Sequence, residues 1–125
     1  MIERYSRKEI KSIWEDYNKY SIWLKIELAA AEAMEKLKII PKGVVKKVKS
    51  KSKINVKRIL QIEEKVKHDV IAFLTSISEK AGKESRYLHK GMTSSDVLDT
   101  CFNLQLKQSG EILLKDIDQL LVSIR

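Results

Sequence analysis

The segment Leu88-His-Lys-Gly-Met-Thr-Ser-Ser-Asp-Val-Leu-Asp-Thr100 decides how the rest of the chain is interpreted. Gly91 allows a tight bend, and three hydroxyls and a carboxylate follow where an apolar helical pattern begins. The first turn of a helix has unpaired N–H groups and the positive end of the helix dipole, so it binds carboxylates and phosphates. The segment therefore predicts a loop, a helix start and an anion site, with His89 and Lys90 beside it.

The same cluster has a purely structural interpretation. Thr93 and Asp96 have the spacing of a capping box, and hydroxyl-rich clusters before apolar runs often serve only as helix caps. The cluster by itself leaves both interpretations open.

The complete string is more specific than the cluster. His-x-Gly-x-Thr-Ser-x-Asp-Val-x-Asp-Thr, which ends at Thr100, resembles the first signature region of the fumarase/aspartase superfamily, and within it that of the adenylosuccinate lyases. These lyases also have an Arg-His-Asp-Val string where this chain has Lys67-His68-Asp69-Val70, and an early Arg-Tyr pair where it has Arg4-Tyr5. The resemblance covers essentially all 125 residues but only the front part of the family's chain.

Composition independently predicts an all-α chain. The 125 residues are 43% hydrophobic and include four Gly and one Pro, which fits one modest helical domain. With the resemblance, this predicts the N-terminal helical domain of the fumarase/aspartase fold over residues 1–92 and the first part of a long central-bundle helix over residues 93–125. The apolar residues of that helix, from Val97 to Ile124, require partner helices. The single cysteine, Cys101, is expected to be a small core residue.

Capping residues and apolar periodicity locate the first two helices. Ser6 and Glu9 form a capping box that starts a helix over residues 6–17, and a longer helix follows over residues 18–37. The predicted buried side of the longer helix consists of Ile22, Trp23, Ile26, Ala29, Ala30, Ala33, Met34 and Leu37.

Three further helices are predicted before the signature segment. Pro41 suits the first turn of a lysine-rich helix, and Asn55 can cap the next one. His68 lies at the junction with a third helix, which Gly82 is placed to end.

The net charge of +8 comes from one segment. Residues 36–58 contain ten Lys or Arg and no acid, so this segment carries +10 and the remainder of the chain −2. Valines at positions 44, 45 and 48 mark an inward face, and no aromatic residues interleave with the lysines, which favours a solvated face over a nucleic-acid site. A non-enzymatic module that binds nucleic acid nevertheless remains one alternative.

The sequence also predicts a cytoplasmic protein with no membrane partner. It contains no run of 18 apolar residues, and its first residues lack the basic-then-apolar pattern of a signal peptide.

The resemblance implies a lyase that cleaves a C–N bond by β-elimination and needs no cofactor or metal. Such an enzyme releases fumarate from adenylosuccinate to give AMP, and from SAICAR to give AICAR. In the family, the base is a Ser and the acid a His, both on segments later than residue 125, and the site is assembled from subunits of a homotetramer. We therefore expect this chain to be an N-terminal fragment that is inactive alone.

The resemblance also implies roles for residues near the two anionic ends of the substrate. Arg4 and Tyr5 are expected to hold the nucleotide phosphate, which His89 also contacts. Thr93 and Ser94 are expected to hold the succinyl or fumarate carboxylate at the helix start.

Lys67, His68 and Asp69 are expected to line the substrate site. His68 is expected to hydrogen-bond the substrate and orient the general acid, with proton donation by His68 itself as the alternative. Lys67 departs from the family's Arg and lacks the planar, bidentate contact that a guanidinium makes with an anion.

Two alternatives to these assignments remain, one for Asp69 and one for the identity of the lyase. Asp69 can act only as a cap for the following helix, and the chain can belong to another superfamily member that acts on argininosuccinate, malate, aspartate or a carboxymuconate. The Arg4-Tyr5 pair and the Lys-His-Asp string favour the purine enzyme.

Overall fold

The structure describes residues 2–124, which form six α-helices and two short 3₁₀ helices joined by loops. No strand occurs in that range. In the computed structural model the order is η1 (Glu3–Tyr5), α1 (Lys8–Ile13), α2 (Asp16–Lys36), α3 (Val44–Lys51), α4 (Val56–Val66), α5 (Asp69–Ala81), η2 (Gly82–Tyr87) and α6 (Ser94–Ile124). Met1 and Arg125, the outer ends of the predicted ranges 1–92 and 93–125, lie outside the residues that the structure describes. The all-α prediction is confirmed.

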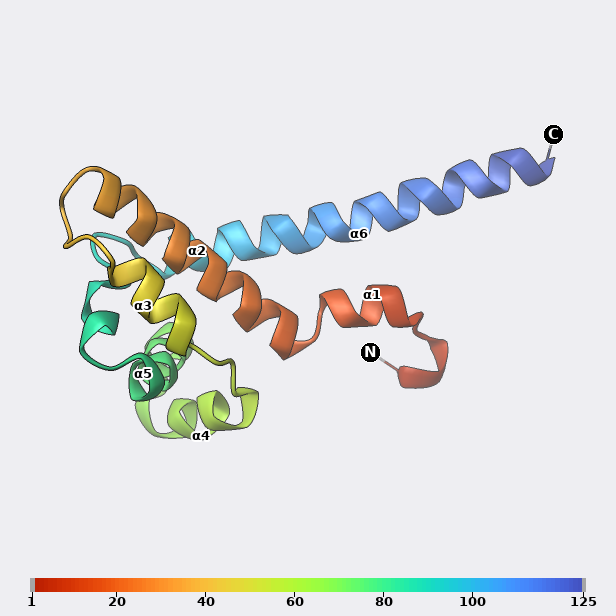
Figure 1. Cartoon of the computed structure of the whole chain (residues 1–125). Coiled ribbons are helices and arrows are strands. Elements are labelled where there is room, and N and C mark those ends of the chain that lie inside the picture. The colour runs from red at the N-terminus through yellow and green to blue at the C-terminus, as the bar shows by residue number, and fades with distance from the viewer. Residues whose placement is uncertain (1, 125) are drawn as a thin grey trace.

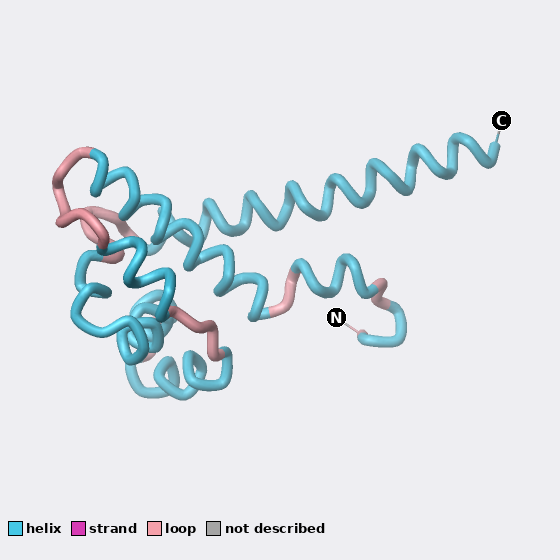
Figure 2. Tube along the Cα trace, in the orientation of Figure 1, coloured by secondary structure: helices cyan, strands magenta, loops and turns pink. Residues whose placement is uncertain are grey.

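Helix α2 is the element against which the others assemble. It contacts α1, α3, α4 and α6, while α4 and α5 pack on each other. Figure 1 shows α3, α4 and α5 gathered at one end of the molecule, from which α6 extends as one long rod. Only short loops separate the helices in Figure 2.

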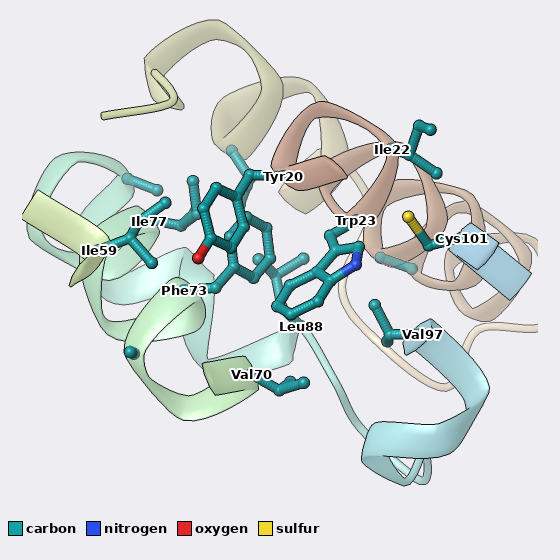
Figure 3. Packing of buried hydrophobic residues seen from close by; sticks show 14 of the residues in the cluster. Tyr20, Ile22, Trp23, Ile59, Val70, Phe73, Ile77, Leu88, Val97 and Cys101 are labelled. Atoms are coloured by element: carbon teal, nitrogen blue, oxygen red, sulfur yellow. The ribbon is translucent and has the colours of Figure 1, made fainter. Parts of the chain in front are cut away.

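Three aromatic side chains form the centre of the core (Figure 3). Tyr20 and Trp23 of α2 and Phe73 of α5 are each at most 1% exposed. The Phe73 ring stacks on Tyr20, with ring centroids 6.0 Å apart, and meets the Trp23 ring edge-on at 5.5 Å. Apolar side chains from the other elements complete the same cluster, including Val48, Ile59, Val70, Ile77, Leu88 and Val97. One continuous core therefore joins α2 to α3, α4, α5 and the start of α6.

The buried stripe of α2 differs from the predicted one beyond Trp23. Three residues that were predicted to be buried are exposed, namely Ala29, Ala33 and Leu37. The stripe that faces the core runs through Tyr20, Trp23, Glu27 and Ala31. These spacings of three and four follow the helical period, so a prediction that selects apolar residues alone misses the glutamate.

The boundary between the first two helices was predicted wrongly. Helix α1 starts at Lys8 and not at Ser6, because the Ser6 hydroxyl donates to the carbonyl of Ile2 and caps nothing. It also ends at Ile13, well short of residue 17. The carbonyl of Ile13 accepts 2.8 Å hydrogen bonds from the side-chain amides of Asn18 and Gln105, which compensates for the broken helical pattern.

Most of the other local predictions are confirmed. The Asn55 side chain accepts the N–H of Arg58 at 3.0 Å and caps α4, and Gly82 ends α5 with a φ of +73°. The prediction for Pro41 was wrong: α3 starts only at Val44, after Gly43 adopts a φ of +91°. A positive φ favours glycine at position 43, and the backbone turns there before the helix starts.

Helix α6 has a packed first part and an unpacked second part. Val97 and Cys101 are buried, which confirms the core position predicted for the cysteine, and burial raises the pKa of its thiol. The last turns of α6 expose large apolar side chains, each 50% to 73% exposed: Leu113, Leu114, Ile117, Leu120, Leu121, Val122 and Ile124. None of the helices within residues 2–124 combines the length and apolar character needed to cross a lipid bilayer.

The two phenylalanines of the chain provide a test of this core. We expect Phe73→Ala to lower the free energy of unfolding by about 3–5 kcal/mol, because the fully buried ring leaves a cavity between two aromatic neighbours. Phe102→Ala, at a ring that is 52% exposed, is expected to cost less than about 1 kcal/mol. Urea denaturation of both variants measures the difference, and equal losses would contradict the assignment of the core.

Candidate functional site at the start of helix α6

The loop of residues 88–93 turns sharply into α6. Gly91, where the sequence allows a tight bend, has a φ of +71°, and His89 also has a positive φ, +58°. The N–H of Met92 donates to the His89 carbonyl at 3.4 Å, and α6 begins at Ser94. A left-handed residue other than glycine costs on the order of 1 kcal/mol, so other contacts must hold His89 in place.

Only half of the predicted capping box is present at the helix start. The Asp96 carboxylate accepts the N–H of Thr93 at 2.8 Å, and the N–H of Asp96 donates to the Thr93 carbonyl at 3.1 Å. Thr93 is exposed and Ser94 is half-buried. Neither hydroxyl has a hydrogen-bond partner within residues 2–124, so both can bind a ligand.

A buried carboxylate holds the loop against α2. Glu27 is 0% exposed, and its two carboxylate oxygens both contact His89. Oε2 accepts the backbone N–H of His89 at 2.6 Å, and Oε1 lies 2.7 Å from Nδ1 of the ring. The His89 side chain is 18% exposed, so Glu27 lies beneath it and the ring remains partly accessible to a ligand.

The junction between α4 and α5 supplies the other predicted site residues. Lys67 ends α4 in the left-handed conformation with a φ of +53°, and its side chain is exposed. The following residue, His68, caps α5 because its ring Nδ1 accepts the N–H of Ile71 at 3.4 Å. The His68 side chain is 46% exposed, so capping leaves part of the ring accessible.

The alternative that Asp69 caps α5 was wrong. Asp69 already lies in the first turn, where its carboxylate accepts the N–H of Val70 at 2.7 Å. Its Oδ1 is 3.5 Å from Nδ1 of His68, so a negative charge lies beside the ring.

Buried residues next to the predicted site residues anchor the α4–α5 junction and the loop before α6 in one core. Val70 follows Asp69 and is 0% exposed, Leu88 precedes His89 and is 7% exposed, and Val97, in the first turns of α6, is 0% exposed. All three belong to one cluster, and Figure 3 shows them around Trp23. The structure thus gathers the segments that carry the predicted His68, His89 and Ser94 around the same core.

The predicted pair Arg4 and Tyr5 lies elsewhere. Both are exposed on η1, with the Arg4 guanidinium 4.8 Å from the centre of the Tyr5 ring. The segment is attached to the far part of α6 through the ion pair of Arg7 with Asp116, 22 residues beyond Ser94. At 1.5 Å per residue this is about 33 Å from the helix start. In Figure 1 the N-terminal segment lies away from the start of α6, so the described residues 2–124 of one chain do not bring all predicted site residues together.

The lysine-rich segment forms a charged surface. Val44 and Val48 are buried as predicted, and the lysines of α3 are exposed. Lys47 binds Glu84 at 3.1 Å, and this hydrogen bond lowers the pKa of the Glu84 carboxyl. Among residues 2–124 no group of three His, Cys, Asp or Glu side chains is arranged to hold a metal ion.

Comparison with known proteins decides the family. A family model described as Lyase matches residues 3–125. The chain belongs to this lyase family. It is 45% identical over 119 residues to the adenylosuccinate lyase of Bacillus subtilis strain 168, and the match covers 95% of this chain and 28% of that protein.

A solved structure shows that this lyase chain shares the fold of a fumarate lyase. The fumarate lyase from Mesorhizobium sp. BNC1 superposes with a TM-score of 0.82 at 22% identity, over 90% of this chain and 27% of that one. The chain thus spans just over a quarter of each of these two relatives.

Glu27 is the residue that the sequence interpretation of this lyase chain missed. Its partner is 62 positions away, so no local motif connects them. A signal was nevertheless present, because Glu27 continues the buried spacing of Tyr20 and Trp23 toward Ala31. A glutamate on the apolar stripe of a helix indicates a buried hydrogen-bonded carboxylate.

The left-handed Lys67 generates a prediction about stability. We expect Lys67→Gly to raise the free energy of unfolding by about 0.5–1 kcal/mol, because glycine tolerates a φ of +53° without a Cβ clash. The matched variant Lys65→Gly, within the last turn of α4, is expected to lower it by a similar amount. Thermal unfolding of both variants checks the signs, and two changes of the same sign would contradict the assigned backbone conformation.

Proposed function

We propose that this chain forms part of an adenylosuccinate lyase, which converts adenylosuccinate to AMP and fumarate, and SAICAR to AICAR and fumarate. The identity of 45% to the Bacillus subtilis enzyme carries this proposal. Likeness to a fumarate lyase of 22% identity supports only the fold, because members that act on different substrates share it.

The proposed reaction requires a strong anion site. β-Elimination removes a weakly acidic proton next to a carboxylate, and the carbanion that forms needs positive charge and hydrogen-bond donors around that carboxylate. The hydroxyls of Thr93 and Ser94 have no hydrogen-bond partner within residues 2–124 and lie at the N-terminus of the 31-residue helix α6, so they are suited to this task. We assign the succinyl carboxylate to them.

The histidines are proposed to act on other parts of the substrate. His68, with Lys67 and Asp69, lines the substrate site, donates a hydrogen bond to the substrate and orients the general acid. His89 contacts the phosphate side. The exposure of part of each ring supports these assignments.

The complete site is proposed to need several copies of the protein. Arg4 and Tyr5, assigned to the nucleotide phosphate, lie beside the far part of α6, so they reach a helix start only if it belongs to another copy. The exposed apolar face of α6 is suited to packing in a helix bundle, which supports the proposed homotetramer. The division into a domain of residues 1–92 and a bundle helix of residues 93–125, and the cytoplasmic location, stay predictions.

A chimera tests the proposed activity. This chain replaces the matching 28% of Bacillus subtilis adenylosuccinate lyase, and the purified chimera is assayed for fumarate release from adenylosuccinate by absorbance. We expect turnover, because the remaining segments supply the family's general acid and base. Turnover of argininosuccinate, malate or aspartate alone would place the chain with another superfamily member, and a folded chimera with no activity would reject the proposal.

Point variants of the chimera test the assigned residues. We expect His68→Ala and Ser94→Ala each to reduce kcat/KM by on the order of a hundredfold or more, since each removes a contact to the reacting substrate. Ser95→Ala is the matched control, because the adjacent exposed hydroxyl has no assigned role and should leave kcat/KM nearly unchanged. Near-normal kinetics in either test variant would remove that residue from the site.

The 125-residue chain alone is expected to be inactive. It lacks the segments on which the family carries its base and acid, so no elimination step is available to it. Incubation of the purified chain with adenylosuccinate, followed by fumarate detection, checks this expectation, and measurable turnover would refute it.

A further inference from the structure

The buried Glu27 determines which atom of His89 faces a ligand. We propose that Glu27 is a positioning residue that accepts the Nδ1–H of His89 and leaves Nε2 as the atom presented at the start of α6. The use of Nε2 on a substrate rests on the proposed function, whereas the position of the proton on the ring does not.

Both carboxylate oxygens of Glu27 contact His89, and the backbone contact fixes one of them as an acceptor. The backbone N–H of His89 can only donate, so Oε2 accepts it at 2.6 Å. In the proposed arrangement Glu27 is ionised and has no proton to give, so Oε1 accepts the Nδ1–H across the 2.7 Å contact. The 2.7 Å distance is in the range of charge-assisted N–H···O⁻ hydrogen bonds, and the 2.6 Å distance is slightly shorter. Glu27 is 0% exposed, so loss of either hydrogen bond would leave a buried carboxylate oxygen without that donor.

The two hydrogen bonds also fix the orientation of the ring. His89 has a φ of +58°, and the hydrogen bond to its N–H holds the backbone in this left-handed conformation. The second hydrogen bond then fixes the ring on that backbone. With Nδ1 directed at the buried carboxylate, Nε2 is the ring nitrogen left for a ligand.

The other histidine of the chain has the opposite arrangement. Nδ1 of His68 accepts the N–H of Ile71 at 3.4 Å, and Asp69 Oδ1 lies 3.5 Å from the same nitrogen. The hydrogen bond from Ile71 favours a neutral His68 ring with its proton on Nε2. A neutral His68 ring therefore donates a hydrogen bond from its Nε2. A neutral His89 ring accepts a hydrogen bond at its Nε2. On an anionic phosphate oxygen, His89 must carry a second proton, and Glu27 then supplies the compensating charge in direct contact.

Nitrogen NMR of the imidazoles tests the proposal directly. The chain has two histidines, and long-range ¹H–¹⁵N correlations of the ¹⁵N-labelled chain report which ring nitrogen carries the proton. A His68→Gln variant assigns the signals. We expect His89 to be protonated on Nδ1 and neutral His68 on Nε2. A His89 ring protonated only on Nε2 would overturn the proposal.

Two variants of α2 separate positioning from general structure. Glu27→Gln keeps the size of the side chain but offers one acceptor oxygen to two donors, so we expect loss of the fixed Nδ1–H signal. Glu32→Gln, on the exposed side of the same helix, should leave the spectrum of His89 unchanged. The wild-type spectrum alone decides the site of protonation, so the proposal stays falsifiable even if Glu27→Gln fails to fold.

The chimera provides a second readout that depends on the proposed function. We expect Glu27→Gln to lower kcat/KM by on the order of tenfold, mainly through KM, because one hydrogen bond that orients a binding group is lost. Unchanged kcat and KM in this variant would overturn the positioning role. An inactive parent chimera with the expected wild-type NMR spectrum would reject the lyase proposal and retain the role of Glu27 in orienting the ring.

Discussion

The hydrogen bonds between Glu27 and His89 are the contact on which the candidate site depends. They connect the central helix α2 to the loop that precedes α6, over 62 positions of sequence. A buried carboxylate is strongly unfavourable unless donors surround it, so the loop and the helix can pack together only in an arrangement that satisfies both oxygens. Because both oxygens contact His89, this requirement constrains the conformation of the loop at that residue.

The aromatic core sets where this contact forms. Trp23 lies one turn before Glu27 on α2 and packs against Phe73 of α5, so the helix that carries the carboxylate is held by the same core that anchors the His68 junction. Val97 extends the cluster into α6. The start of α6 and the junction between α4 and α5, which carry the candidate site residues, therefore lie at the edge of one apolar cluster. The far part of α6 lacks such packing within residues 2–124 and exposes its apolar face.

Local signals in the sequence predicted the features that depend on nearby residues. The Asn55 cap, the end of α5 at Gly82 and the loop that leads into α6 follow from short-range hydrogen bonds and φ preferences. The predicted start of α1 at Ser6 was wrong because the Ser6 hydroxyl bonds backward to Ile2, and the neighbouring Arg7 pairs with a residue of α6 that is 109 positions away. Periodicity treats every charged residue as exposed, so it missed Glu27. The roles of the site residues came from a family resemblance and stay predictions.

A double-mutant cycle on unfolding tests the central claim most directly. Glu27→Gln, His89→Ala and the double variant are compared by urea denaturation, which isolates the bond between Oε1 and the ring because His89→Ala retains the backbone N–H. We predict a coupling free energy of about 1.5–3 kcal/mol, as expected for a buried hydrogen bond to a charged group. Additive effects of the two substitutions would contradict the account.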